Sequence, residues 1–394
     1  MRTPEERVSV VLAESGHAIG GTERVVWELA TRLPGHRFEV RVWLSESPGV
    51  NDLAAALEDK GVPVDRVPEV DSRWDWRGLL DTWRRLRRAR PRLLHVHHVW
   101  PAADRYLTGL AELAAIPHLV ITEHIEGRSH SPAQRALKRR ELARADAVTA
   151  VCGAVADSLV RDYGVDRARL RVVGNGADLP DAAESEAARL LRVELGAGPQ
   201  RPLWVCAARL EEQKGHAVLL DALADLARRG QDFRMALAGE GARRAALEAR
   251  AAELGLDGRV RFLGQVDEIG PLLACADAIV MPSLWEGLPL TLLEALVRAR
   301  PLVASAVGGI PEVVTHGESG WLVPAGDPVA IADALETLHR RPDLALQLGR
   351  EGARRVREDY TWPRVVERFE AVYDEVLGLA SFVPASGARR GRAT

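Results

Sequence analysis

The hydrophobic pattern predicts two successive series of buried strands, each followed by an amphipathic helix. The first series contains the apolar runs VSVVLA, FEVRVWL, LLHVHHV, HLVITEH and AVTAVCG. The second contains PLWVCAARL, FRMALAGEG, VRFLG, AIVMPS and PLVASAV, and ends with a helix from about Asp327. Continuous apolar runs that alternate with helical patterns are typical of βαβ units, whose parallel sheets are covered on both faces.

The two series predict an α/β protein with two Rossmann-like domains that face each other across a cleft. The alternation lapses over residues 180–202, where Pro and Gly frame a short helical pattern. We therefore expect one domain over residues 1–180, a second over 181–360 and a disordered tail over 381–394.

Composition adds little to this picture. The 394 residues carry a formal net charge of −3, which gives no electrostatic reason to expect a nucleic acid partner. The three cysteines, Cys152, Cys206 and Cys275, lie far apart in sequence, which indicates reduced thiols in the core of a cytoplasmic protein. The count is also compatible with an extracellular protein that has one unpaired thiol. With no signal peptide and no apolar run of about 18 residues, we expect the protein to stay inside the cell.

Glycines and cations follow two of the predicted strands. Gly20 and Gly21 follow the first, where they would let backbone N–H groups approach a phosphate or serve only a tight turn. The dinucleotide glycine fingerprint is not satisfied, which disfavours a nicotinamide enzyme. Arg209 and Lys214 follow PLWVCAA and are either solvated or positioned to hold a diphosphate. Since the chain has no D-x-D motif for a metal, such cations would stabilise a phosphate leaving group unaided.

Two glutamates flank a predicted helix start in SLWEGLPLTLLEAL. Glu286 lies just before it and Glu294 within it, eight positions later. Stabilisation by the helix dipole explains an acid near the helix start and accounts for Glu286. It leaves Glu294 unexplained.

The chain resembles the retaining GT-B glycosyltransferases of family 4. The carboxyl-terminal half carries ARLEEQKGH, LAGEGARRAALE, FLGQV, ADAIVMPSLWEGLPLTLLEAL, VASAVGGIPEVV and GESGWLVPAGD in this order. The amino-terminal half carries GGTERVVWELATRLPGH, the VHH around His97, ITEH and VVGNGAD. The resemblance implies an acceptor-side first domain, a second domain that binds a nucleotide sugar, and a last helix, about residues 361–380, that packs back on the first domain.

The same resemblance implies roles for individual residues. Glu286 would contact the donor sugar and the charge that develops at its anomeric carbon, and Glu294 would bind the ribose hydroxyls. The backbone amides from Leu288 to Thr291 would hold the diphosphate, except at Pro289, which has no N–H. The other residues that the resemblance assigns to the site are Arg209 and Lys214 at the leaving diphosphate, Gly20, Gly21, Leu290 and Asn175 around the donor, His124 near the reacting sugar and Glu312 as a second-tier contact.

By resemblance, the protein transfers a hexosyl unit to an acceptor hydroxyl with retention and without a metal or other cofactor. A UDP-sugar is the favoured donor and a GDP-sugar the next, and the acceptor is a cell-envelope glycan or glycolipid precursor. Family analogy favours a front-side reaction, in which the β-phosphate oxygen takes the acceptor proton. A nucleotide-sugar epimerase of the same fold and a degenerate nucleotide-sugar-binding protein are the alternatives.

Residues 76–94 carry seven arginines beside apolar residues at helical spacing, among them Leu79, Leu80, Trp83 and Leu86. Either the apolar stripe faces the core, which we favour, or the segment lies on an anionic membrane. The second alternative would make the protein peripheral at the inner face of the membrane. One of His97 and His98 is expected to face the core, and a zinc site there has no partner at a familiar spacing.

Overall fold

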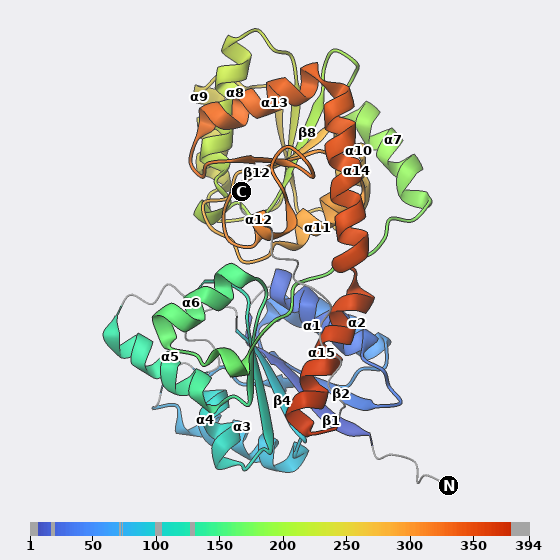
Figure 1. Ribbon diagram of the computed structural model, residues 1–394. Helices are drawn as coiled ribbons and strands as arrows, with labels where there is room; N and C mark the ends of the chain where they lie inside the picture. The colour runs from blue at the N-terminus through green and yellow to red at the C-terminus, as the bar shows by residue number, and fades with distance from the viewer. Residues whose placement is uncertain are drawn as a thin grey trace. The chain divides into compact units, whose positions relative to one another are not determined.

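The computed structural model describes residues 7–16, 20–70, 72, 74–98, 105–126 and 131–379. These residues divide into two compact units, each built on one parallel sheet (Figure 1). Unit 1 holds the described residues up to Ala150, residues 156–173 and those from Pro363 onward, while unit 2 holds Val151–Val155 and Gly174–Trp362. The predicted disordered tail, 381–394, lies outside the described residues.

The units meet in sequence at Val173 and Gly174, before the predicted boundary at residue 180. The reason is local packing, because a Cβ at Gly174 would lie 3.0 Å from a side-chain carbon of Leu288 in unit 2. The next residue, Asn175, is buried and bonds the same segment. The chain thus joins unit 2 before the helical pattern that suggested the boundary.

Unit 1 is a seven-stranded parallel sheet with the strand order β3-β2-β1-β4-β5-β6-β7. Its strands are β1 (Val8–Glu14), β2 (Phe38–Ser45), β3 (Val64–Val67), β4 (Leu93–His98), β5 (His118–Glu123), β6 (Ala147–Ala150) and β7 (Leu170–Val172). Its helices are α1 (Gly21–Arg32), α2 (Asn51–Asp59), α3 (Trp76–Ala89), α4 (Arg105–Leu113), α5 (Pro132–Arg144) and, from Ala156 onward, α6 (Gly153–Tyr163), with short 3₁₀ turns at Pro48–Val50 and Arg167–Arg169. The first residues of α6, up to Val155, belong to unit 2.

The last helix, α15 (Trp362–Leu377), completes the core of unit 1. Phe369 and Tyr373 are buried, and the Tyr373 ring lies edge-on to Phe38 of β2 with 5.8 Å between the ring centroids. The Tyr373 hydroxyl also lies 2.7 Å from Nδ1 of His95 on β4. Unit 1 is therefore assembled from the two ends of the described chain, as the blue strands and the red helix in Figure 1 show.

Unit 2 is a six-stranded parallel sheet with the order β10-β9-β8-β11-β12-β13. Its strands are β8 (Leu203–Ala207), β9 (Arg234–Ala238), β10 (Val260–Gly264), β11 (Ala278–Met281), β12 (Leu302–Ser305) and β13 (Trp321–Val323). Its helices are α7 (Ala183–Glu194), α8 (His216–Arg228), α9 (Arg244–Glu253), α10 (Ile269–Cys275), α11 (Leu290–Val297), α12 (Ile310–Val313), α13 (Pro328–Arg340) and α14 (Pro342–Asp359), with a 3₁₀ turn, η3, at Glu212–Lys214. The predicted α/β class with two parallel sheets is confirmed.

The three cysteines are free and buried, as the sequence predicts. No helix in the described part of the chain combines the length and the apolarity that a membrane crossing requires.

Candidate active site

Each sheet reverses its strand order once, and several predicted site residues, among them Gly21, Lys214 and Glu286, follow the strands at these reversals. In unit 2 the reversal lies between β8 and β11, and in unit 1 between β1 and β4. Ligands of open parallel sheets bind beyond the carboxyl ends of the strands at such a point. The loops that follow these strands are therefore where a ligand site is expected in each unit.

Two loops of unit 2 bring Lys214 to Glu286. Lys214 ends the turn η3 after β8, Glu286 follows β11, and their Nζ and Oε1 atoms lie 2.5 Å apart. The same Oε1 accepts a hydrogen bond from Ser283 Oγ at 2.8 Å, and Gln213 Nε2 lies 3.4 Å from Oε2. The side chain of Glu286 is only 5% exposed and that of Lys214 16%, so the pair is shielded from water. A buried carboxylate requires such partners.

Glycine at position 215 permits this approach of the two loops. Gly215 has a φ of 67°, in the left-handed region, and a Cβ here would lie 2.0 Å from the carbonyl oxygen of Pro282. The Leu284 amide donates to the Gln213 carbonyl at 2.8 Å and ties the loops together. A side chain at position 215 would force apart the backbones that carry Lys214 and Glu286.

A third loop, after β12, packs against the backbone of Glu286. Gly308 has a φ of 54°, and a Cβ there would lie 2.1 Å from the Glu286 carbonyl oxygen. The Gly309 amide donates to the Gly287 carbonyl at 2.7 Å. Three loops thus fix Glu286 at the reversal of the unit 2 sheet.

The helix after Glu286 begins directly after Pro289. Pro289 is the residue before the helix, with an extended ψ of 135°, and α11 starts at Leu290. The amide of Leu288 therefore precedes the helix, and its carbonyl accepts a hydrogen bond from Asn175 Nδ2 at 2.6 Å. Leu290 and Thr291 supply amides of the first helical turn, which have no partner within a helix.

The remaining predicted residues of unit 2 are spread around these loops. Arg209 is exposed, and its side chain makes no hydrogen bond or ion pair with the described residues. Glu294 lies half-buried on α11. The Glu312 carboxylate accepts from the amides of Gly153 and Ala154 at 2.8 and 2.9 Å, at the start of α6. The predicted donor contacts of all three residues stay predictions.

In unit 1, Gly20 and Gly21 lie at the start of α1. Gly20 is the residue before the helix, and its amide donates to Glu23 Oε2 at 2.8 Å. Glu23 is buried, so a carboxylate of the chain itself already occupies this helix start. A phosphate at Gly20 and Gly21 would have to share the helix start with Glu23.

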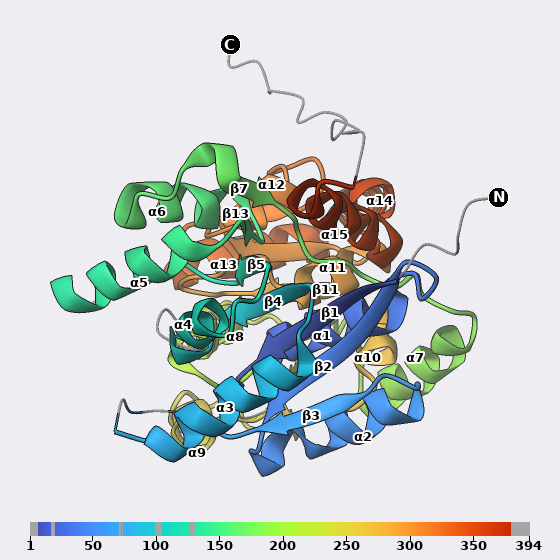
Figure 2. The same cartoon turned by 90° about the horizontal axis from the view of Figure 1, so that it is seen from below.

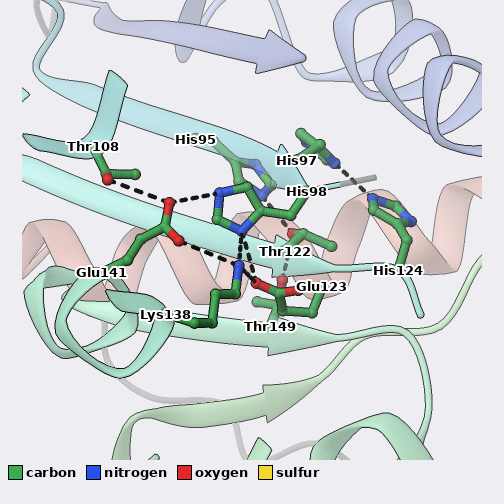
Figure 3. A network of polar contacts seen from close by, with 10 residues as sticks. All are labelled: His95, His97, His98, Thr108, Thr122, Glu123, His124, Lys138, Glu141 and Thr149. Atoms are coloured by element: carbon green, nitrogen blue, oxygen red, sulfur yellow. Dashed lines mark hydrogen bonds and ion pairs between the residues drawn. The ribbon is translucent and has the colours of Figure 1, made fainter. Parts of the chain in front are cut away.

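His124 follows β5 and forms a pair with His97 at the end of β4. Its Nε2 lies 3.1 Å from His97 Nδ1, and the stacked rings have centroids 5.4 Å apart (Figure 3). Burial lowers the pKa of His124 to about 4, and Glu123 and His98 act on it in opposite directions. The half-buried His124 is therefore a neutral imidazole at neutral pH.

A buried charge cluster lies beside this pair, formed by His98, Glu123, Lys138 and Glu141 (Figure 3). Lys138 Nζ lies 2.5 Å from Glu123 Oε1 and 3.4 Å from Glu141 Oε2. His98 reaches the same carboxylates through Nδ1 at 2.7 Å and Nε2 at 3.2 Å. Each of the four side chains is at most 4% exposed. Two cations and two carboxylates balance, so the cluster is neutral only when His98 is protonated.

The pKa directions agree with this charge balance. Burial and Lys138 lower the pKa of His98, but Glu141 and Glu123 outweigh them and raise it to about 9. Burial raises the pKa of Glu123, but Lys138 and His98 bring it down to about 2. Lys138 Nζ also lies 2.7 Å from His98 Nδ1, so the two carboxylates favour a charge on His98 against this neighbouring cation.

The sequence reasoning missed this cluster. It expected one of His97 and His98 to face the core, whereas both are buried. Lys138 and Glu141 stand in a stretch of α5 that is rich in arginine and reads as solvated. The available signal is their spacing with Leu142, which is also buried, because residues three and four apart share one helix face.

These histidines predict a stability maximum near neutral pH. Burial lowers the pKa of His95 to about 3, and so folding becomes less favourable as pH falls from 6.5 toward 3. The pKa of His98 is raised to about 9, so its contribution is complete below 6.5 and is lost as pH rises through 9. The free energy of unfolding, measured with urea and monitored by amide exchange in β4, should be highest near pH 6.5, where both contributions are complete. A stability that rises steadily from pH 6 to 9 would contradict the charged His98.

No group of three or more His, Cys, Asp or Glu side chains in the described ranges could hold a metal ion.

Comparison with solved structures defines the class of protein. HepE of Anabaena, solved in complex with UDP-glucose, superposes with a TM-score of 0.82 at 20% identity, over 94% of this chain and 100% of HepE. Sucrose-phosphate synthase from Thermosynechococcus elongatus gives a TM-score of 0.77 at 21% identity, over 95% and 100% of the two chains. The architecture is the GT-B fold of glycosyltransferases.

Sequence comparison identifies the family. The model "Glycosyltransferase Family 4" matches residues 19–180, and "Glycosyl transferases group 1" matches residues 201–341. An alpha-maltose-1-phosphate synthase of Mycolicibacterium smegmatis is 30% identical, over 72% of this chain and 79% of that protein. A D-inositol 3-phosphate glycosyltransferase of Streptomyces avermitilis is 29% identical, over 91% and 83% of the two chains. The chain belongs to the group 1 glycosyltransferases of family 4, and the predicted family and GT-B fold are confirmed.

Proposed function

We propose that this glycosyltransferase moves a hexosyl unit from a UDP-sugar, or next a GDP-sugar, to an acceptor hydroxyl with retention and without a bound metal. The observation that carries the proposal is the shielded Lys214–Glu286 pair at the reversal of the unit 2 sheet. A fixed cation beside a carboxylate suits a reaction that builds negative charge on a leaving diphosphate and positive charge on a sugar. The UDP-glucose bound by HepE, a protein of the same fold, favours a uridine donor.

In this reaction the bond from the anomeric carbon to the diphosphate breaks, and the acceptor oxygen bonds the same face of that carbon. Lys214 and the exposed Arg209 neutralise the diphosphate as its charge grows. A β-phosphate oxygen takes the acceptor proton, while Glu286 stabilises the positive charge of the sugar without forming a covalent bond. The first-turn amides of Leu290 and Thr291 bind the diphosphate, Glu294 binds the ribose, and closure around the substrates excludes water.

The test is the release of nucleoside diphosphate from a panel of UDP, GDP and ADP sugars in the presence of chelator. We expect slow release from one donor by the unmodified protein, and none by Glu294→Ala or Lys214→Ala. The anomeric configuration of a transferred sugar, read by NMR, should match that of the donor. An inverted product would refute the mechanism, a released sugar isomer would indicate an epimerase, and binding without turnover would indicate a degenerate protein.

For the acceptor, we propose a cell-envelope glycan or glycolipid precursor that is met at an anionic membrane surface. Helices α3 and α4 of unit 1 lie side by side (Figure 2). An open groove of about 460 Å³ lies along them. Only apolar side chains line it: Trp76, Leu79, Leu80, Trp83, Leu110 and Leu113. Trp76 is 62% exposed and Leu113 73%. Of the stripe that was expected to face the core, Leu86 is buried, whereas Leu79, Leu80 and Trp83 are half-buried.

Arginines border this groove. The guanidinium groups of Arg77 and Arg87 lie 5.1 and 5.3 Å from the ring centroids of Trp76 and Trp83. Apolar side chains next to cations are the pattern of a helix that lies in the interface of an anionic bilayer. The relatives named for inositol 3-phosphate and maltose 1-phosphate suggest a small phosphorylated acceptor as the competing choice.

Vesicle sedimentation tests the membrane proposal. The protein should sediment with vesicles of anionic phospholipid at low salt and be released as salt rises, since salt screens the arginines. Trp76→Ser combined with Leu113→Ser should abolish sedimentation, whereas Val172→Ser, also at an exposed apolar residue of unit 1, should not. Absence of sedimentation at low salt would leave the small phosphorylated acceptors as the better choice.

A further inference from the structure

Three imidazole rings lie in a row that runs from the middle of β4 to just past the end of β5 (Figure 3). His95 and His97 are two apart on β4, so they project from the same face of the sheet, with ring centroids 4.1 Å apart. His124 extends the row, with its ring centroid 5.4 Å from that of His97. The row ends at His124, beyond a strand end, which is where ligands of a parallel sheet bind.

All three rings are neutral at neutral pH. Burial is the main cause that lowers the pKa of His95 to about 3 and the pKa of His124 to about 4. Burial, together with the neighbouring histidines, also lowers the pKa of His97 well below its ordinary value. A neutral imidazole carries one N–H donor and one acceptor nitrogen. The contact between His97 and His124 therefore has one donor and one acceptor, and the position of one proton determines that of the other.

The burial of His97 decides between the two arrangements. Its Nδ1 faces His124 Nε2 at 3.1 Å, while its Nε2 is buried and has no hydrogen-bond partner among the described residues. With the proton on Nε2, a donor would be buried unpaired. With the proton on Nδ1, the donor is used in the bond to His124. Buried N–H groups without a partner are rarer in proteins than under-satisfied acceptors.

We propose that His97 is a positioning residue that donates its Nδ1–H to His124 Nε2, and so fixes His124 with its own proton on Nδ1. Nδ1 lies on the far side of the ring from His97 (Figure 3). His124 then presents a hydrogen-bond donor, which suits a hydroxyl or phosphate oxygen of a bound substrate. It has no free lone pair with which to act as a base. This rests on the proposed function, in which a phosphate oxygen, and no protein side chain, takes the acceptor proton.

The tautomer can be measured without any turnover. Long-range proton–nitrogen NMR of the protein labelled with ¹⁵N-histidine should show His124 protonated on Nδ1 and His97 protonated on Nδ1, with both rings neutral at pH 7. Signals are assigned from His97→Asn and His124→Asn. Finding the His124 proton on Nε2 would overturn the proposal, whatever the activity. A protein with the expected tautomer that transfers no sugar would instead contradict the proposed function.

Activity provides the second readout. His97→Ala should lower kcat/KM about tenfold, the value of one hydrogen bond, and His97→Asn should restore most of it because its amide can donate from the Nδ1 position. His36→Ala, at an exposed turn of the same unit, is the control and should leave kcat/KM unchanged. Equal losses in His97→Ala and His97→Asn would assign His97 a purely structural role and refute the proposal.

Discussion

Replacing Lys214 by methionine is expected to lower kcat/KM for sugar transfer by about 10²–10³-fold, the usual loss when one preorganised electrostatic group is removed. The substitution keeps most of the side-chain volume and removes the cation that lies 2.5 Å from Glu286 Oε1. It leaves the Glu286 carboxylate shielded, with Ser283 and Gln213 as its remaining hydrogen-bond donors. The measurement is nucleoside diphosphate release under saturating acceptor, with thermal unfolding recorded to confirm that unit 2 is folded.

Arg228→Met is the matched control for Lys214→Met. Arg228 ends α8, the helix that follows Lys214, and its side chain is 75% exposed. Its loss should change kcat/KM by less than about twofold, because an exposed ion pair contributes little. A Lys214→Met protein with normal kcat/KM would show that the Lys214–Glu286 pair serves the fold and not the reaction.

Lys138→Met is expected to reduce the free energy of unfolding of unit 1 by about 3–5 kcal/mol, as when one partner of a buried ion pair is removed. Lys138 is 2% exposed and bridges Glu123 and Glu141. Without it, the two buried carboxylates keep His98 as their one cationic partner, and the cluster carries an unbalanced negative charge. Urea unfolding monitored by amide exchange in β4 and β5 measures the effect on unit 1.

The control for this second prediction is Arg140→Met. Arg140 lies two residues further along α5 and is exposed, so its loss should change unit 1 stability by no more than about 0.5 kcal/mol. The double variant Lys138→Met with Glu141→Gln should be more stable than Lys138→Met, because it removes the excess negative charge. If Lys138→Met unfolds at the same urea concentration as the unmodified protein, the cluster does not stabilise unit 1.

The apolar runs were sufficient to predict both parallel sheets, because a strand buried on two faces has few polar positions. The hydrophobic pattern predicted neither β3 nor β13 as a strand. In β3, VDRV, two adjacent charged residues stand between the valines, and all four residues are only half-buried at a sheet edge. Helix α14 was also missed, since its charged residues, counting its two aspartates, outnumber its apolar ones. Edge elements bury less surface, and so their sequences carry a weaker hydrophobic signal.

The site residues that the sequence could predict also lie next to strongly apolar strands. Glu286, Lys214 and Arg209 could be named because they belong to motifs in loops that directly follow apolar strands. The contact between Lys214 and Glu286 could not, because it joins residues 72 positions apart through the approach of Gly215 to Pro282. The partners of His98 were less visible, since only the spacing of Lys138 and Glu141 with Leu142 marks a buried face on this arginine-rich helix. Polar side chains whose hydrogen-bond and ion-pair partners come only from tertiary contacts can be identified only from the folded structure.

The place of α15 in unit 1 has a consequence for synthesis on the ribosome. The nascent chain presents β1 to β7 first, but Phe369 and Tyr373, which cover Phe38 and His95, are among the last described residues to be made. Unit 2, which is continuous from Gly174 to Trp362, leaves the exit tunnel before that helix does. We therefore expect one face of the unit 1 sheet to stay uncovered while unit 2 folds. Unit 2 would then complete its fold before unit 1, although domains usually fold in order from the amino terminus. Truncation before Trp362 should therefore leave a chain that depends on chaperones to remain unaggregated.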